Sequence, residues 1–446
     1  MKVAILGYDT EGKVSYEYFK AQGHDVTICD QKTDIEIPEG ADSVLGPDYL
    51  KDLDRFDVLV RTPGLKPSLI LENNPTVADK ITSGTNEFFK ASPTKNIIGV
   101  TGTKGKGTTS TLITKILEAA GNKVFLGGNI GVPALSFIQE VTVDDWVVLE
   151  LSSFQLIDCK YSPNAAVCLM VVPEHLNWHA DMAEYLDAKR QLFAHQTPED
   201  LAIYNACSEN SIEIVRSSPG VKGWYQTKPI NHLVGLSQEP ERGVRVENGH
   251  IVAANEEICS VDELALLGEH NWDNVCAAIA ATWEIIGHDR EAVRQVVTTF
   301  SGLEHRLELV RTLNGVAYYD DSFGTTPETA MVAIEAFEEP KIVILGGSDK
   351  GTSFDELART VKSHHVKFAI LIGETAPAIE KALIGAGYAT IVHGGDNMTD
   401  IVATAKSFAE SGDVVLLSTG CASFDLFKDY KDRAAQFQQA VNSLAQ

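Results

Sequence analysis

Residues 102–109 form a segment that could bind a phosphate group, because it combines glycines, lysines and hydroxyl side chains. It reads Gly-Thr-Lys-Gly-Lys-Gly-Thr-Thr. Glycines let backbone N–H groups approach an anion, Lys106 can reach the outer phosphates of a nucleotide, and a hydroxyl after it can hold Mg²⁺. The interval from Gly102 to Gly105 is shorter than in the general phosphate-loop pattern. The flanking residues still predict the required frame, a buried strand over 97–100 and a helix over 108–120.

An acid and a histidine follow other buried strands of the same region. Glu150 ends an apolar strand predicted over 146–150, which is where a Mg²⁺ ligand belongs in a phosphate-loop domain. His175 follows a strand predicted over 165–172, and both a ligand role and a structural role stay open for it. Lys189 lies in a helix predicted over 182–193, and taken alone it is typical of a surface lysine.

Alternating strands and helices predict an α/β protein of three domains. Residues 1–92 open as a Rossmann-like unit, but their glycine pattern is loose, so a dinucleotide, a nucleotide or a sugar nucleotide could bind there. Residues 93–298 form a central P-loop ATPase-like domain, in which 206–262 are expected to be β-rich and a helix is expected up to 286. Residues 299–446 form a third, Rossmann-like domain.

Composition excludes several classes of function. The formal net charge is −25 and no Lys/Arg cluster offers a basic face, so nucleic acid is not an expected partner. No apolar run approaches the roughly 20 residues that cross a membrane, and the apolar start is too short for a signal peptide. Seven scattered cysteines favour reduced thiols in a cytoplasmic protein.

From the residues alone, the phosphate loop, Glu150 and His175 indicate an enzyme that uses ATP and a divalent metal. Two further α/β regions would allow several ligands to be held at domain interfaces. An ATPase, a kinase and a ligase all remain possible at this point.

The chain resembles the Mur ligase family, which builds the stem peptide of peptidoglycan and includes folylpolyglutamate synthase. The resemblance covers nearly the whole chain and depends on the order and spacing of short motifs at 102–106, 128–133, 149–155, 174–179, 188–189, 268–271, 302–306 and 321–322. Within the family, segments 150–155 and 417–428 resemble the branch that adds D-glutamate.

The resemblance implies an ATP-dependent ligase. The γ-phosphoryl group of ATP would pass to the terminal carboxylate of UDP-N-acetylmuramoyl-L-alanine, and the amine of D-glutamate would then attack the acyl phosphate. ATP would be bound by Gly102, Thr103, Lys104, Gly105, Lys106, Gly107, Thr108 and Thr109, with Asn271 on the adenine, Arg306 on the phosphates and Asp321 on the ribose.

It also implies two Mg²⁺ ions and a modified lysine. Thr108 and Glu150 would bind one ion, because Gly107 follows Lys106 and moves the expected hydroxyl to Thr108. His175 would bind the second ion with Lys189, which in this family is typically carbamylated. Lys106, Glu150, His175 and Lys189 are therefore the expected catalytic residues.

The resemblance places the substrates on the outer domains of a protein expected to be a monomer. The UDP-sugar would contact Tyr8, Asp9, Thr10, Asp30, Gln31, Thr62 and Gly64, and also Asn129, Ser152 and Gln155 of the central domain. D-Glutamate would lie near Thr325, Lys350, Ser423, Phe424 and Tyr430.

Two positions depart from the D-glutamate branch. Phe323 stands where that branch usually has lysine, and Pro327 is similar to the sister ligases. Two alternatives therefore stay open, a ligase that adds another amino acid such as L-glutamate and a non-catalytic UDP-sugar-binding regulator.

Overall fold

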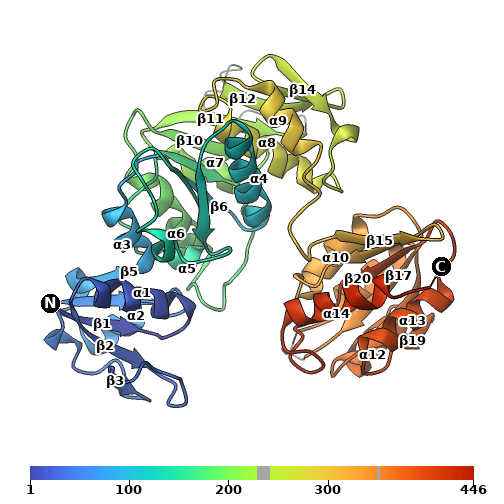
Figure 1. Cartoon of the computed structure of the whole chain (residues 1–446), viewed down its shortest axis with the longest axis horizontal. Coiled ribbons are helices and arrows are strands. Elements are labelled where there is room, and N and C mark those ends of the chain that lie inside the picture. Colours follow the sequence, from blue (N-terminus) through green and yellow to red (C-terminus); the bar gives the residue numbers. More distant parts are fainter. Residues whose placement is uncertain (229–241, 349–351, 446) are drawn as a thin grey trace. The chain divides into compact units, whose positions relative to one another are not determined.

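The structure is a computed structural model that describes residues 1–228, 242–348 and 352–445. Its helices and strands confirm the α/β class, and the strands form three sheets (Figure 1). The chain folds as two compact units, one of Met1–Leu264 with His270–Phe300 and the other of Ala265–Glu269 with Ser301–Gln446. The three domain boundaries expected from the sequence stay a prediction.

The first sheet is parallel, with strand order β3-β2-β1-β4-β5. Along β1, Val3 and Ile5 enter one apolar core while Ala4 and Leu6 enter another, as expected for a strand that is covered on both faces. The elements of this sheet are β1 (Lys2–Leu6), α1 (Thr10–Ala21), β2 (Asp25–Asp30), β3 (Asp42–Leu45), β4 (Val58–Arg61), α2 (Pro67–Asn73), β5 (Ile81–Ser83) and α3 (Gly84–Ala91).

The second sheet has the order β14-β13-β12-β11-β10-β9-β6-β8-β7. It is parallel from β7 to β12, and β13 and β14 extend it as antiparallel strands. Its strands are β6 (Ile97–Thr101), β7 (Val124–Gly128), β8 (Trp146–Glu150), β9 (Ala165–Cys168), β10 (Leu201–Asn205), β11 (Val221–Gln226), β12 (Gly243–Glu247), β13 (His250–Ala253) and β14 (Glu256–Ser260).

Helices pack on this second sheet, and α4 lies beside the alanine-rich α8 (Figure 1). The bounds are α4 (Lys106–Ala119), α5 (Ser153–Leu156), α6 (Met182–Ala194), α7 (Glu209–Arg216), α8 (His270–Thr282) and α9 (Arg290–Val297). Four expectations need correction: α4 begins at Lys106 rather than at 108, β9 ends at Cys168 rather than at 172, the helix expected up to 286 ends at Thr282, and α7 interrupts the region expected to be β-rich. The α7 sequence is amphipathic and Ser208 caps it, and those are the signals that the β reading missed.

The third sheet, in the second unit, has the order β15-β16-β20-β17-β18-β19, with only β15 antiparallel to its neighbour. Helices cover both faces, so that two separate apolar cores form. Its elements are β15 (Glu308–Leu313), β16 (Val316–Asp320), α10 (Pro327–Glu335), β17 (Lys341–Gly346), α11 (Asp355–Ser363), β18 (Val366–Ile372), α12 (Ala376–Gly385), β19 (Ile391–His393), α13 (Met398–Phe408), β20 (Val414–Leu417) and α14 (Tyr430–Asn442).

A buried ion pair joins the first two sheets. Arg61, at the end of β4, is fully buried and binds Asp158 through Nε at 2.7 Å and through a second guanidinium nitrogen. The same side chain donates to the carbonyl of Phe154 at 2.9 Å. Because a buried guanidinium needs all of its donors paired, these bonds fix β4 against the segment that follows α5.

None of the helices within the described ranges combines the length and the apolar composition that a membrane crossing requires.

Replacing Arg61 by methionine should lower the free energy of unfolding by about 3–5 kcal/mol, because it leaves the Asp158 carboxylate without its partner. Denaturant titration measures this loss. Arg190→Met is the matched control, since Arg190 pairs with Asp187 at the surface of α6 and should change stability by only about 0.5 kcal/mol. Equal losses in the two variants would show that the Arg61 pair contributes no more than a surface pair does.

Candidate functional site

The segment between β6 and α4 forms the loop that the glycines predict. Gly102 has φ +146°, and a Cβ there would lie 2.6 Å from the Cβ of Leu169. Gly105 has φ +87° and caps the N-terminus of α4. Both positions therefore require glycine, and the N–H groups of the first turn of α4 can face an anion.

Two lysines meet at one carbonyl of this loop. Lys106 Nζ donates to the carbonyl oxygens of Gly102 at 3.2 Å and Thr103 at 3.0 Å. Lys189 Nζ, from α6, donates to the same Gly102 oxygen at 2.8 Å. Burial and, after it, the nearby positive charge of Lys106 together lower the pKa of Lys189 to about 7.

Lys189 is only 1% exposed, so the surface position that its sequence context favours is wrong. Its Nζ lies 4.5 Å from the centroid of the Tyr185 ring. The Tyr185 hydroxyl in turn lies 3.0 Å from Thr103 Oγ1, on the phosphate loop. Tyr185 thus fixes the distance between α6 and the loop.

Asn274 connects α8 to the same loop. Its Oδ1 accepts a hydrogen bond from Thr109 Oγ1 at 3.2 Å, and its Nδ2 donates to Asn271 Oδ1 at 2.8 Å. A Cβ at Gly105 would lie 2.1 Å from Asn274 Oδ1. These contacts bring Asn271 next to the loop. The sequence did not identify Asn274 as a site residue, although the polar run before an alanine-rich helix was a signal that could have indicated it.

The carboxyl end of β8 carries the acid expected to bind metal. Glu150 is buried, and its Oε1 accepts from Asn129 Nδ2 at 2.7 Å. The Asn129 backbone N–H also donates to the Glu150 carbonyl at 2.8 Å. Ser152 and Gln155 follow as a capping box that begins α5. The structure thus gathers Glu150 with three residues expected near the UDP-sugar.

His175 has φ +58°, an uncommon conformation for a residue other than glycine. Its ring lies 4.7 Å from that of Phe154, and its Nε2 is 3.6 Å from Glu174 Oε2. Burial lowers the pKa of His175; Glu174 opposes this shift and the charges of Lys106 and Lys189 add to it. A neutral imidazole of this kind can bind a metal. Thr108 is buried in the first turn of α4.

The residues expected to hold the uridine end lie at the carboxyl ends of β1, β2 and β4. Asp30 accepts from the Tyr8 backbone N–H at 2.7 Å, and Asp9 caps α1 by accepting from Gly12 at 3.1 Å. Thr62 Oγ1 donates to the Leu6 carbonyl at 3.2 Å. Thr10 begins α1 and Gln31 is exposed directly after β2. The carbonyl of Gly64 accepts from Trp178 Nε1 at 3.2 Å.

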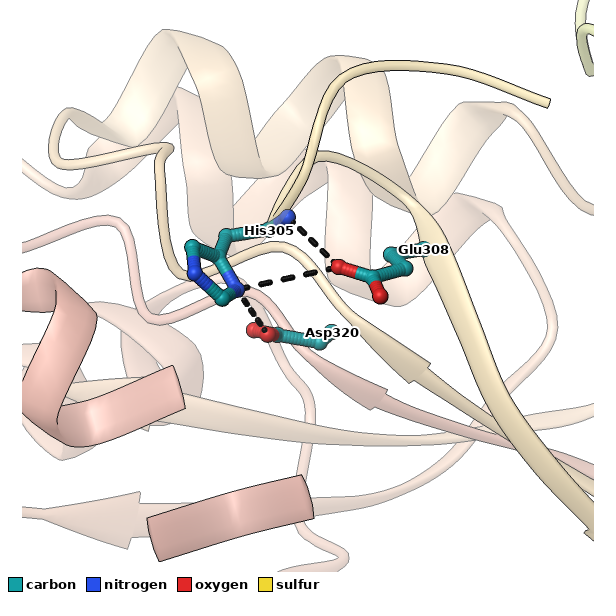
Figure 2. A group of neighbouring side chains, drawn as sticks. All are labelled: His305, Glu308 and Asp320. Atoms are coloured by element: carbon teal, nitrogen blue, oxygen red, sulfur yellow. Dashed lines mark hydrogen bonds and ion pairs between the residues drawn. The ribbon is translucent and has the colours of Figure 1, made fainter. Parts of the chain in front are cut away.

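In the second unit, a histidine and two acids hold the turn that carries Arg306 (Figure 2). His305 Nδ1 lies 2.9 Å from Asp320 Oδ2, and the His305 backbone N–H donates to Glu308 Oε2 at 2.7 Å. His305 and Leu307 both have positive φ, of +61° and +48°. Because these contacts hold a strained turn together, the cluster has a structural role in this chain.

Asp321 is joined to the same turn. Its Oδ1 accepts from the Leu307 N–H at 3.3 Å and its Oδ2 from Ser418 Oγ at 2.6 Å. Burial raises the pKa of Asp321 to about 7, against the lowering effects of the Ser418 hydrogen bond and of Arg306. The adjacent Ser322 hydroxyl is buried, and no hydrogen-bond partner for it lies within the described ranges.

The residues expected around D-glutamate follow β16 and β20. Phe424 is exposed, Ser423 is buried, Thr325 is half-buried, and Tyr430 begins α14. Lys350 lies outside the described residues. The sequence reading missed Arg433, which is fully buried and donates to the carbonyls of Cys421 at 3.1 Å and Ser322 at 2.8 Å. Arg433 thus ties the two loops to each other.

The site combines a glycine loop at the start of a helix, a strand-end acid and a buried lysine on the parallel part of a sheet. This combination defines a phosphate-loop α/β protein. Residues 100–282 match the Mur ligase middle domain, and residues 305–421 match the domain described as Mur ligase, glutamate ligase domain. The chain belongs to the Mur ligase family.

Relatives match over almost their full length. The UDP-N-acetylmuramoylalanine–D-glutamate ligase of Acetivibrio thermocellus is 36% identical over 464 residues, covering 99% of this chain and 96% of the relative. The enzyme of the same name from Symbiobacterium thermophilum is 36% identical over 460 residues, covering 100% and 98%.

Solved structures of lower identity share the fold. The UDP-N-acetylmuramate-alanine ligase MurC from Thermotoga maritima has a TM-score of 0.60 at 16% identity, covering 99% of each chain. The MurF ligase from the same organism, solved in complex with ADP, has a TM-score of 0.59 at 16% identity, covering 99% of this chain and 95% of that one.

Gly105→Ala should abolish ATP binding, because the new Cβ would collide with Asn274 Oδ1 as well as strain the backbone. Calorimetric titration with ATP measures the affinity. Gly121→Ala is the matched control: Gly121 follows α4 with φ +86° and has nothing within 4 Å of a Cβ, so it should cost about 1–2 kcal/mol of stability and leave ATP binding intact. Unchanged ATP affinity in Gly105→Ala would contradict the assignment of this loop.

Proposed function

We propose that this protein joins D-glutamate to UDP-N-acetylmuramoyl-L-alanine with cleavage of ATP, as a cytoplasmic step of peptidoglycan precursor synthesis. The observation that carries the proposal is the joint arrangement of Lys106 and Lys189 on the Gly102 carbonyl. The names of the full-length relatives support the substrates, and the ADP complex of the MurF neighbour supports the use of ATP.

The chain's own residues favour Lys106 as the phosphate-binding lysine. Its ammonium is held at the loop by two carbonyl oxygens, which are weaker partners than the phosphates of a nucleotide. We assign the β- and γ-phosphates of ATP to Lys106 and to the N–H groups at the start of α4. Asn271 is assigned to the adenine, Arg306 to the phosphates and Asp321 to the ribose.

The donor set near the loop fits Mg²⁺. Glu150 offers a carboxylate oriented by Asn129, Thr108 a buried hydroxyl, and His175 a neutral imidazole. Mg²⁺ bound there would neutralise the negative charge that gathers on the transferred phosphoryl group. Glu150 and Thr108 are assigned to one ion, and His175 with Lys189 to a second.

Lys189 fits carbamylation because its pKa of about 7 leaves roughly half of its amine neutral near pH 7. A neutral amine adds to CO₂: its nitrogen forms the new N–C bond, one C=O π pair moves to oxygen, and the nitrogen releases a proton. The product carries a negative charge where an ammonium stood. This change removes the repulsion between Lys189 and Lys106 and supplies oxygen donors beside the loop.

In the proposed reaction, the acceptor carboxylate attacks the γ-phosphorus of ATP and ADP leaves, which gives an acyl phosphate. The amine of D-glutamate then attacks the acyl carbon, loses a proton, and inorganic phosphate departs. Lys106 holds the phosphoryl group through both steps, while Asn129, Ser152 and Gln155 orient the acceptor. Positioning and charge neutralisation are the main contributions of the chain.

One observation favours a second candidate for the amino acid. Phe323 is 44% exposed, and its ring meets that of Tyr430 edge to face at 5.5 Å. This side chain offers no positive charge to the side-chain carboxylate of D-glutamate, unlike the lysine usual at this position. A ligase of the same family that adds another amino acid is therefore the alternative.

A panel of amino acids decides between the two candidates. Phosphate release is measured with ATP, Mg²⁺, UDP-N-acetylmuramoyl-L-alanine and one amino acid at a time. We expect D-glutamate to give at least tenfold higher kcat/KM than L-glutamate or other amino acids, a difference of about 1.4 kcal/mol in transition-state binding. Release with a different amino acid, and none with D-glutamate, would overturn the substrate assignment. Nucleotide binding without any release would favour the non-catalytic alternative.

A further inference from the structure

Glu11, on the helix α1 that packs on the first sheet, forms a hydrogen bond with Gln155 of the second sheet's site. It has no role in the reaction described above. Glu11 lies in the first turn of α1, directly after the residues assigned to the UDP-sugar. Its Oε1 accepts a hydrogen bond from Gln155 Nε2 at 2.7 Å, although 144 residues separate the two in sequence. This bond adds to the other contacts between the first two sheets, which include the Arg61–Asp158 pair and the hydrogen bond from Trp178 to Gly64.

Further hydrogen bonds connect Gln155 to Ser152, which follows the end of β8. Gln155 is 2% exposed, and its Oε1 accepts from both the backbone N–H of Ser152 at 2.9 Å and the Ser152 hydroxyl at 3.0 Å. Both ends of the Gln155 amide are therefore hydrogen-bonded, Oε1 by Ser152 and Nε2 by Glu11, and Glu11 is the partner that holds the Nε2 end. Glu11 therefore lies at the outer end of a chain of hydrogen bonds that reaches Ser152, two residues after the strand-end acid Glu150.

The surroundings of Glu11 leave little freedom to its side chain. It borders a cavity of about 10 Å³ with Gly84, Leu135, Leu149 and Gln155, roughly enough for one water molecule. A Cβ at Gly84 would lie 3.7 Å from Glu11 Oε2, so the first turn of α3 closes over the carboxyl group. Arg61, the nearby cation, is committed to Asp158.

The carboxyl group accepts from Gln155 in either protonation state. Burial raises the pKa of Glu11 to about 7; the Gln155 hydrogen bond and Arg61 lower it, and Asp9 raises it. A neutral carboxylic acid retains an acceptor oxygen, as does a primary amide. The contact therefore requires an oxygen acceptor at this place rather than a charge.

We propose that Glu11 is a positioning residue that orients Gln155 and, through it, the segment 151–155 that follows the strand-end acid Glu150. Glu11 acts through Gln155 and touches neither the nucleotide nor the reacting atoms. The functional part of this inference rests on the proposed ligase function, while its structural part can be measured without turnover.

The test compares Glu11→Ala, Glu11→Gln, Gln155→Ala and the double variant Glu11→Ala/Gln155→Ala in the full chain. Glu11→Ala should lower kcat about tenfold or more, because a displacement of the segment of less than 1 Å misaligns the acceptor. Glu11→Gln should retain kcat within about threefold, since its amide oxygen still accepts from Gln155. The double variant should be no slower than the slower single variant, which is the signature of residues that act through one contact.

Hydrogen–deuterium exchange of residues 151–157 supplies a readout that does not depend on activity. Exchange there should rise in Glu11→Ala and stay at the wild-type level in Glu11→Gln. Glu17→Ala is the matched control, because Glu17 is an exposed acid on the same helix; it should change neither exchange nor kcat.

Two results would overturn the proposal: unchanged exchange in Glu11→Ala, or a kcat for Glu11→Ala within about twofold of wild type. Additive losses in the double variant would also overturn it, because they would show that Glu11 acts independently of Gln155. Absence of turnover in the wild-type protein would instead refute the proposed ligase function, and the exchange measurement would still decide whether Glu11 holds the segment.

Discussion

The placement of two lysine side chains on one backbone carbonyl is the constraint around which the site is built. Lys106 and Lys189 both donate to the oxygen of Gly102. Two ammonium groups at one oxygen repel each other, and the pKa of Lys189 is lowered first by its burial and then by this repulsion from Lys106. The repulsion is relieved when the amine of Lys189 is neutral, and a negative carbamate on Lys189 would relieve it further. Lys106 then remains as the cation available to a phosphate.

The rest of the first unit serves to hold that carbonyl and the groups around it. Tyr185 and Asn274 bring α6 and α8 to the two sides of the loop. Gly102 and Gly105 permit this close approach because a side chain at either position would collide with its neighbour. Arg61 joins the first sheet to the segment after α5. In the second unit, Arg433 and the cluster around His305 hold the Arg306 turn and Asp321 in the same way.

The parts of the site that depend on local sequence could be predicted, and the parts that depend on tertiary burial could not. The strand, loop and helix around Lys106 follow from apolar spacing and glycines, so the predicted frame differs from the structure by one residue at the end of the strand, two at the start of the helix and one at its end. Glu150 was placed by its position at the end of an apolar strand. Lys189 carries no local signal of burial, because its environment is made by the phosphate loop, 87 residues earlier in the chain. The same reason hid Asn274, Arg433 and Glu11, whose partners lie on distant segments.

The state of the Lys189 amine is the most direct test of this account. The protein is equilibrated with ¹³C-labelled bicarbonate at pH 8, and ¹³C NMR spectra of wild type and Lys189→Ala are compared. Since the pKa of Lys189 is about 7, most of its amine is neutral at that pH, and we expect a carbamate resonance in the wild type that is missing in the variant. The signal should fade as the pH drops below 7, because the ammonium form does not react. A fully active wild-type protein that shows no carbamate signal under saturating bicarbonate would contradict the account.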